Sequence, residues 1–259
     1  MPNVAPATDT FRLSIVLPVL NEAPRLPRLL QLLRAGFPAA ELLVVDGGSS
    51  DDTAGAALRG GATLLLGEAG RAAQMNLGAA AARGTWLFFL HADSEPRFTG
   101  AQLEACLESA LAGAAPTGAR CPCWGFFRVR LSGNSPALRV IGWFMNRRSR
   151  LTRVATGDQG LLVRRRTFEA LGGFAAIPLM EDVEVCKRLR RAAPPLGLPL
   201  TVVSSGRRWE EQGVVRTVAR MWLLRLAFWL GASPQRLWRY YYGRAALSTQ
   251  AGTGAGAVD

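Results

Sequence analysis

The sequence has little lysine and little histidine. Among 31 basic residues only Lys187 is a lysine, and His91 is the only histidine in 259 residues. The formal net charge is nevertheless +12, which favours an anionic partner such as a phosphorylated substrate, a nucleic acid or a membrane surface. The arginines are scattered along the chain and form no nucleic-acid-binding motif, so we expect no nucleic-acid partner.

Cysteine is also scarce. The four cysteines stand at positions 106, 121, 123 and 186, and Cys121 and Cys123 are too close together to be two ligands of one structural metal. Residues 1–10 lack the basic segment and apolar stretch of a signal peptide. No uncharged apolar run reaches the roughly 18 residues of a membrane-spanning helix. We therefore expect reduced thiols and a cytoplasmic protein.

Short apolar runs alternate with helical patterns in the first half of the chain. Hydrophobic residues make up 49% of the sequence, which is enough for a buried core. Leucines at 26, 29, 30 and 33 form one apolar stripe along a predicted helix. Strands are predicted at 13–20, 41–46, 62–66 and 86–90. This alternation predicts an α/β fold with a mostly parallel sheet flanked by helices, which binds ligands at the carboxyl ends of its strands.

The second half is less regular. Two further strands are predicted, at 124–131 and 160–164. Helices are predicted at 135–151, 181–191, 214–230 and 234–242. We expect residues 1–10 to be a flexible N-terminus and residues 244–259 to be a disordered tail.

An acid and two glycines end the predicted strand at 41–46. The glycines after Asp46 let the backbone turn closely around a ligand, and the carboxylate can accept hydrogen bonds from a nucleotide base. A plain turn, with Ser50 or Asp51 capping the next helix, explains residues 50–53 but not the acid at the strand end. The Gly-x-Gly-x-x-Gly pattern is absent at this turn, which weighs against a dehydrogenase.

Residues 14–22, Ser-Ile-Val-Leu-Pro-Val-Leu-Asn-Glu, and the segment at 44–53 together resemble the opening of the family 2 glycosyltransferases. These are inverting enzymes with the GT-A fold, a Rossmann-like α/β fold. The resemblance implies that four residues bind the nucleotide of a nucleoside-diphosphate sugar: Pro18, Glu22, Asp46 and Gly48. Residues 70–76 resemble the family's stretch that crosses the nucleotide and diphosphate. This resemblance implies that Arg71 and Asn76 contact the donor. Arg71 stands at the start of a predicted helix, whose free amide groups favour anions.

His91, Ala92 and Asp93 stand where the family carries its Asp-x-Asp metal motif. The resemblance implies that Asp93 binds a divalent cation, Mn²⁺ or Mg²⁺, and that Ala92 lies near the nucleotide sugar. His91 replaces the first acid, and its nitrogen is better suited to Mn²⁺ than to Mg²⁺. The alternative is a histidine at the strand end that only forms hydrogen bonds.

The Met-Glu-Asp segment at 180–182 resembles the family's acidic pair at the start of a helix. A single displacement at the anomeric carbon needs one carboxylate to take the proton from the acceptor hydroxyl. The resemblance implies that Asp182 is this base, with Glu181 beside it. Both could instead be ordinary first-turn acids, stabilised by the helix dipole. We place Asp158 and Gln159 near the acceptor or the ribose.

Residues 207–209 resemble the Arg-Trp end of a motif found in processive members. There Arg208 would stabilise the departing diphosphate and Trp209 would stack on the acceptor. The leading glutamine of the motif is not matched, so processivity is not implied, and a buried tryptophan beside a surface arginine is the alternative. The apolar helix at 214–230 either lies on an anionic membrane surface or packs against the main domain.

We expect one GT-A domain over 11–210, with a nucleotide-binding half at 11–95 and an acceptor half at 96–210, followed by C-terminal helices over 211–243. The predicted activity is inverting transfer from a nucleoside-diphosphate sugar to a hydroxyl or carboxyl of a small-molecule or lipid acceptor, in the cytoplasm or peripherally at the inner face of the cell membrane. Details of the motifs resemble a bacterial branch labelled as carotenoid-acid or arsenosugar-related glycosyltransferases, but fold and motif do not fix the acceptor. The alternatives are a nucleotidyltransferase, which would release pyrophosphate, and a catalytically silent nucleotide-sugar-binding or membrane-associated protein. The sugar, the base and the oligomeric state stay open.

Overall fold

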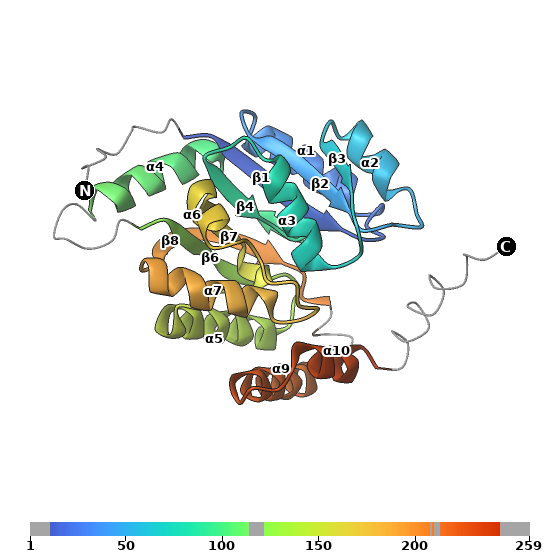
Figure 1. The fold of residues 1–259 in the computed structure, drawn as a ribbon, viewed down its shortest axis with the longest axis vertical. Helices are drawn as coiled ribbons and strands as arrows, with labels where there is room; N and C mark the ends of the chain where they lie inside the picture. The colour runs from blue at the N-terminus through green and yellow to red at the C-terminus, as the bar shows by residue number, and fades with distance from the viewer. Residues whose placement is uncertain (1–10, 114–121, 208, 210–212, 244–259) are drawn as a thin grey trace.

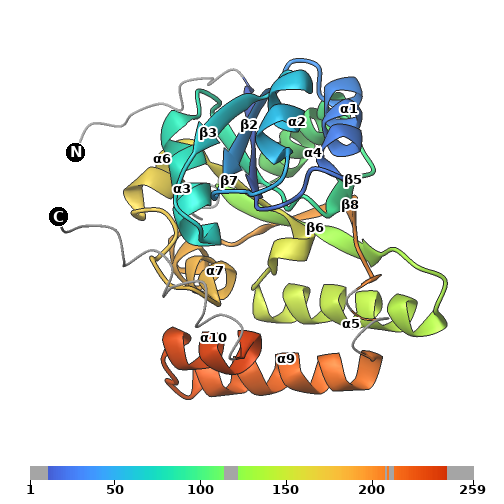
Figure 2. The same ribbon diagram turned by 90° about the vertical axis from the view of Figure 1, so that its right-hand side faces the viewer.

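The computed structural model describes residues 11–113, 122–207, 209 and 213–243 (Figures 1 and 2). The described chain forms one eight-stranded sheet in the order β3-β2-β1-β4-β7-β6-β8-β5. The strands are β1 (Leu13–Val19), β2 (Glu41–Asp46), β3 (Thr63–Leu66), β4 (Trp86–Phe89), β5 (Ser94–Pro96), β6 (Trp124–Leu131), β7 (Leu161–Arg164) and β8 (Leu196–Ser204). The helices are α1 (Leu26–Gly36), α2 (Thr53–Arg59), α3 (Arg71–Ala81), α4 (Gly100–Ala112), α5 (Pro136–Thr152), α6 (Arg165–Ala170), α7 (Glu181–Ala192), α9 (Val214–Trp229) and α10 (Pro234–Tyr242), with a short 3₁₀ helix η1 (Gly157–Gln159).

The first four strands pair with one another only in parallel. β1 pairs in parallel with β2 and β4, and β2 pairs in parallel with β3. Successive residues of β1 enter different hydrophobic clusters, with Ile15 in one and Val16 in the other, because side chains alternate between the faces of a strand. Both faces are therefore buried, as the continuous apolar runs predict.

The second half adds antiparallel pairs. β7 is antiparallel to both β4 and β6, β5 is antiparallel to β8, and β8 is parallel to β6. Four of the seven strand pairs are parallel, which confirms the mostly parallel α/β sheet.

Helices cover both faces of this sheet (Figure 1). The leucine stripe of α1 is buried as predicted, and it joins α2 and α4 over one face. Buried side chains of α3, α6 and α7 pack on the other face. The ends of the strands are left open between these layers, and there the loops can meet a ligand.

The C-terminal helices pack against the body of the protein. Leu224 of α9 and Leu237 of α10 form a cluster with Met180 and Val183 at the start of α7. In Figure 2, α5, α9 and α10 lie at the end of the molecule that is opposite β2 and β3. α9 thus makes the packing contacts that the sequence left open, but its other side stays exposed at Trp222 and Trp229. Within the described residues, no helix has the length and hydropathy to cross a bilayer.

Candidate active site

A cavity of about 320 Å³ lies where segments from both halves of the chain converge. Glu22 follows β1, Arg71 begins α3, and His91 and Asp93 follow β4. The opposite wall comes from η1, from the start of α7 and from α9 and α10. The carboxyl ends of β1 and β4 therefore open into the cavity, as expected for a parallel α/β sheet.

Three possible metal ligands meet in this cavity. One ligand atom from each of His91, Asp93 and Asp158 lies within 4.8 Å of the other two. Ser204 Oγ donates a hydrogen bond to Asp158 Oδ1 at 3.1 Å, and Ser94 Oγ donates one to Asp93 Oδ1 at 3.3 Å. Two carboxylates and an imidazole are a suitable donor set for Mn²⁺, and the carboxylates also suit Mg²⁺. Asp158 thus joins the predicted metal residues, although the sequence suggested the acceptor or ribose side for it.

A close contact ties His91 to η1. A Cβ atom added to Gly157 would lie 2.0 Å from Cε1 of His91, so only glycine fits against the imidazole ring at this distance. The contact brings the segment after β4 against the turn that carries Asp158.

Asp182 lines the same cavity in the first turn of α7. Its Oδ2 accepts a hydrogen bond of 3.0 Å from the Gly157 amide, and its Oδ1 accepts one of 2.7 Å from the Val183 amide. Burial raises the pKa of Asp182, and these two hydrogen bonds oppose that rise. The carboxylate is therefore held in one orientation and is more basic than an ordinary aspartate.

Glu181 and Arg71 form the buried charge environment of Asp182. Burial and the neighbouring Asp182 raise the pKa of Glu181 to about 7, and the charge of Arg71 opposes this. Desolvation lowers the pKa of Arg71, but the surrounding acids, with Glu181 first, more than offset it, so that the pKa is raised. Arg71 therefore keeps its positive charge in the cavity.

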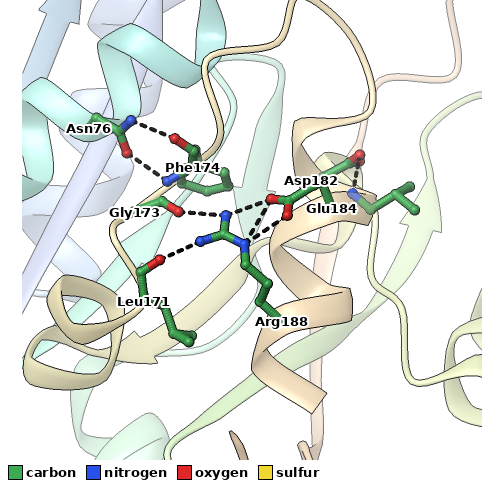
Figure 3. A network of polar contacts seen from close by, with 8 residues as sticks. Asn76, Leu171, Gly173, Phe174, Asp182, Glu184 and Arg188 are labelled. Atoms are coloured by element: carbon green, nitrogen blue, oxygen red, sulfur yellow. Dashed lines mark hydrogen bonds and ion pairs between the residues drawn. The ribbon is translucent and has the colours of Figure 1, made fainter. Parts of the chain in front are cut away.

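The segment that leads into α7 is clamped by two side chains (Figure 3). Asn76 Nδ2 donates to the Phe174 carbonyl at 2.9 Å, and the Phe174 amide donates to Asn76 Oδ1 at 2.8 Å. Arg188 donates to the carbonyl oxygens of Leu171 and Gly173 at 2.5 and 2.7 Å and to the Glu184 carboxylate at 2.5 to 3.0 Å. The clamp fixes the path of the chain towards Glu181 and Asp182.

The predicted nucleotide residues are spread along the neighbouring strand ends. Glu22 lines the cavity and pairs with Arg25 at 2.7 Å. Asp46 is buried and accepts hydrogen bonds from the Ser49 amide and hydroxyl at 2.9 and 2.6 Å. Gly48 follows with a φ of 88°, a conformation that glycine adopts without strain. Asp46 thus shapes the glycine turn after β2, and neither Asp46 nor Gly48 lines the cavity.

Other predicted residues lie at the edge of the cavity or outside it. Pro18 lies within β1, and Ala92 lines an adjoining cavity that shares Asp93 with the main one. Asn76 forms the clamp described above and does not line the cavity.

Gln159 is fully buried, where its Oε1 accepts from Ser149 Oγ at 2.5 Å and its Nε2 donates to the Phe127 carbonyl at 3.3 Å. These hydrogen bonds stabilise η1, and Gln159 does not line the cavity. Trp209 is buried and does line the cavity, together with Arg207, whereas Arg208 falls outside the described residues.

The C-terminal helices contribute residues that the sequence motifs did not indicate. From α9 and α10 these are Thr217, Met221, Arg225, Tyr241 and Tyr242. The only sequence signal is the aromatic and basic composition of 234–242. The cavity therefore combines residues from 11–210 and from 211–243.

Solved structures share this fold. The mannosyltransferase PcManGT from Pyrobaculum calidifontis, in complex with GDP-Man and Mn²⁺, covers 100% of this chain and 80% of its own, with a TM-score of 0.58 and 19% identity. A fragment of S. aureus TarS (residues 1–349), in complex with UDP-GlcNAc, covers 75% of this chain with a TM-score of 0.52 and 14% identity. The match spans 58% of that fragment, which is less than two thirds of its length. At these identities the likeness shows the GT-A fold.

Sequence comparison gives the family. No curated protein matches the chain in sequence. The family model described as Glycosyl transferase family 2 matches residues 14–167, which is more than half of the chain. With the GT-A fold and a cavity at the expected strand ends, the chain belongs to glycosyltransferase family 2 and is a glycosyltransferase.

Proposed function

We propose that this glycosyltransferase moves a sugar from a nucleoside-diphosphate sugar to an acceptor hydroxyl or carboxyl with inversion at the anomeric carbon. One observation carries the proposal. The amide of Gly157 binds Asp182, while the next residue, Asp158, belongs to the cluster with His91 and Asp93. The turn at 157–158 thereby connects the proposed base to the proposed cation site. In a bound donor, the base would lie near the anomeric carbon and the cation near the diphosphate.

His91, Asp93 and Asp158 are the residues that would hold a divalent cation. When bound, the cation would offset negative charge on the diphosphate of the donor. Arg71 adds a fixed positive charge on the same wall, where it favours binding of the diphosphate. We assign the binding of the nucleotide to Glu22 and Asp46. Pro18, Gly48 and Ala92, in or after the same group of strands, would also contact the nucleotide sugar.

Asp182 has the properties of a general base. Its two hydrogen bonds from backbone amides fix the direction of its carboxylate, and its raised pKa makes it a better proton acceptor than an exposed aspartate. One oriented carboxylate is sufficient for a single displacement, in which the acceptor oxygen attacks as its proton passes to Asp182.

We propose that residues 11–210 and the helices of 211–243 act as one functional unit, because both line the cavity. We also propose that the outer side of α9 contacts an anionic membrane surface. Exposed Trp222 and Trp229 on this helix, together with the exposed Arg216, support that interaction.

The donor can be identified by thermal shift with nucleoside diphosphates and nucleotide sugars, each with Mn²⁺, Mg²⁺ or a chelator. A ligand at about 100 times its dissociation constant adds roughly 2.7 kcal/mol of stability. The stabilisation should depend on the cation, and Asp93→Asn should weaken that dependence.

With the donor known, Asp182→Asn should lower the transfer rate by roughly 10² to 10⁴-fold, while the protein stays folded and still binds the donor. Glu169→Gln, an exposed acid on α6, is the matched control and should be fully active. Transfer should release a nucleoside diphosphate, and NMR of the product should show the inverted anomer. Release of pyrophosphate, or a retained anomer, would contradict the proposal.

A further inference from the structure

A second, apolar cavity of about 300 Å³ lies between α5 and α9. Its apolar walls come from three residues of each helix: Ile141, Phe144, Met145, Val218, Met221 and Trp222. We call this cavity the α5–α9 groove. Phe144 and Trp222 are 58% and 65% exposed, so the groove opens to the outside along its apolar rim.

The groove adjoins the catalytic cavity. Asp158, Trp209, Met221 and Arg225 line both spaces. Asp158 is also one of the three candidate metal ligands, so the inner end of the groove lies beside the reacting groups. An occupant of the groove therefore has direct access to the catalytic cavity.

The charged groups of the groove lie towards the catalytic cavity: Asp158 and Arg225 line both spaces, and Arg148 interacts electrostatically with Asp182 and Asp158. Arg148 and Arg225 are the basic residues that line the groove. Guanidinium groups bind oxygen-bearing groups through charge-assisted hydrogen bonds, so these two arginines favour a polar, oxygen-bearing end of an occupant.

We propose that the α5–α9 groove binds the apolar chain of an amphiphilic acceptor, whose oxygen-bearing end enters the catalytic cavity. The inference rests on the proposed function, because it identifies the groove's occupant as the acceptor of that transfer. An apolar channel that ends in two arginines and a catalytic cavity matches a molecule with one hydrocarbon part and one polar, reactive end. A fully polar acceptor would leave the apolar walls exposed to water, at a cost in free energy.

Alkyl glucosides of increasing chain length, used below their micelle concentrations, provide a probe. Each methylene that enters the groove should tighten binding about fourfold, and titration calorimetry with butyl, hexyl and octyl glucoside measures this. With the donor present, the longer chains should also lower the KM for release of nucleoside diphosphate while kcat stays unchanged.

Two double variants distinguish alkyl glucoside binding in the groove from binding elsewhere on the surface. Phe144→Ser with Trp222→Ser removes groove side chains that are exposed, so folding should be retained, and the dependence on chain length should flatten. Leu151→Ser with Leu226→Ser changes side chains on the same two helices that are 72% and 55% exposed and do not line the groove. This control should keep the wild-type dependence.

Equal affinity for butyl and octyl glucoside, or an unchanged dependence in the groove variant, would overturn the inference. Binding of nucleotide sugars, measured on the same samples, separates the two proposals. Donor binding without any dependence on chain length removes the groove assignment alone. Octyl glucoside binding without donor binding or transfer removes the proposed function, and the acceptor role of the groove with it.

Discussion

At the scale of single residues, the two adjacent acids of α7 make the stability of the protein depend on pH. The Glu181 side chain is buried, and its pKa of about 7 lies above the ordinary value of 4.5. The folded state therefore binds more protons than the unfolded state between these two values. The stabilisation is complete below pH 4.5 and is lost as the pH rises through 7.

Glu181→Gln should consequently reduce the loss of stability between pH 5 and pH 8, by about 3 kcal/mol at most. The free energy of unfolding, measured with urea at both pH values, tests this. Asp182→Asn should also make the loss smaller, because the charge of Asp182 raises the pKa of Glu181. The exposed Glu169→Gln should behave as the wild type. The same pH dependence in wild type and Glu181→Gln would show that Glu181 titrates normally.

Residue types and the family resemblance indicated part of the site from the sequence. His91 and Asp93 were indicated because a histidine and an acid at a strand end have few structural roles, and Asp182 was indicated by its resemblance to the family's acidic pair at a helix start. His91, Asp93 and Asp182 do line one cavity. The roles of Asn76 and Gln159 were harder to predict, because an amide side chain can form hydrogen bonds equally well with a ligand or with the backbone. Asn76 pairs with a residue 98 positions away in sequence, and Gln159 pairs with one 32 positions away. Only the folded chain reveals such partners.

At the scale of elements, the segment before α7 determines where Asp182 points. Met180, directly before the helix, has a φ of 69°, a conformation that is costly for a residue other than glycine. Arg188 holds this segment through two carbonyl groups and binds Glu184 of its own helix (Figure 3). We therefore predict that Arg188 is a positioning residue for Glu181 and the proposed base Asp182.

Arg188→Lys should lower kcat more than it weakens donor binding, because lysine retains the charge but cannot reproduce the planar fork of hydrogen bonds. We expect a loss of stability of about 1–3 kcal/mol. Steady-state kinetics and donor titration measure the two effects separately. Arg166→Lys, an exposed arginine of α6, is the control and should change neither. An unchanged kcat in a destabilised Arg188→Lys protein would leave Arg188 with a purely structural role.

The sequence predicted most accurately those helices and strands that have a clear hydrophobic repeat. β2, β6 and α10 begin and end where the sequence predicts, since each has a clear repeat and distinct ends. The sequence patterns did not predict β8, in which Pro199 interrupts the apolar run. The register between β6 and β8 shifts between Phe126 and Arg128, which pair with Gly197 and Thr201. Pro199 falls in this irregularity, where no regular ladder hydrogen bond is needed.

At the scale of the whole molecule, the C-terminal helices complete the cavity. Sequence motifs indicated the cavity residues Glu22, His91 and Asp93 because these follow strands of one sheet. They do not identify Arg225 or Tyr242, which reach the cavity only because α9 and α10 fold back against α7. Arg220 reinforces this arrangement by donating to the carbonyl groups of Tyr240 and Tyr241 of α10.

The same helices give the molecule a basic end. α5, α9 and α10 contain nine arginines and no acidic residue, and they lie close together in Figure 2. Trp143, Trp222 and Trp229 are among their exposed side chains. Arginine attracts anionic lipid by about 1 kcal/mol per residue near the surface, and tryptophan favours the interface between lipid and water. Part of the net positive charge of the chain is therefore concentrated on these three helices, which composition alone could not show.

We therefore predict that the protein sediments with vesicles containing phosphatidylserine at low salt and much less with neutral phosphatidylcholine vesicles. Binding to the anionic vesicles should fall as salt is raised, because exposed charges are screened over about 10 Å at 0.1 M. Trp222→Ser with Trp229→Ser should weaken binding at every salt concentration, since it removes apolar contact but no charge. Leu66→Ser, at a side chain that is 72% exposed on β3, should bind as the wild type. Equal sedimentation with neutral and anionic vesicles would contradict the electrostatic part of the prediction, and no sedimentation at low salt would rule out the membrane contact.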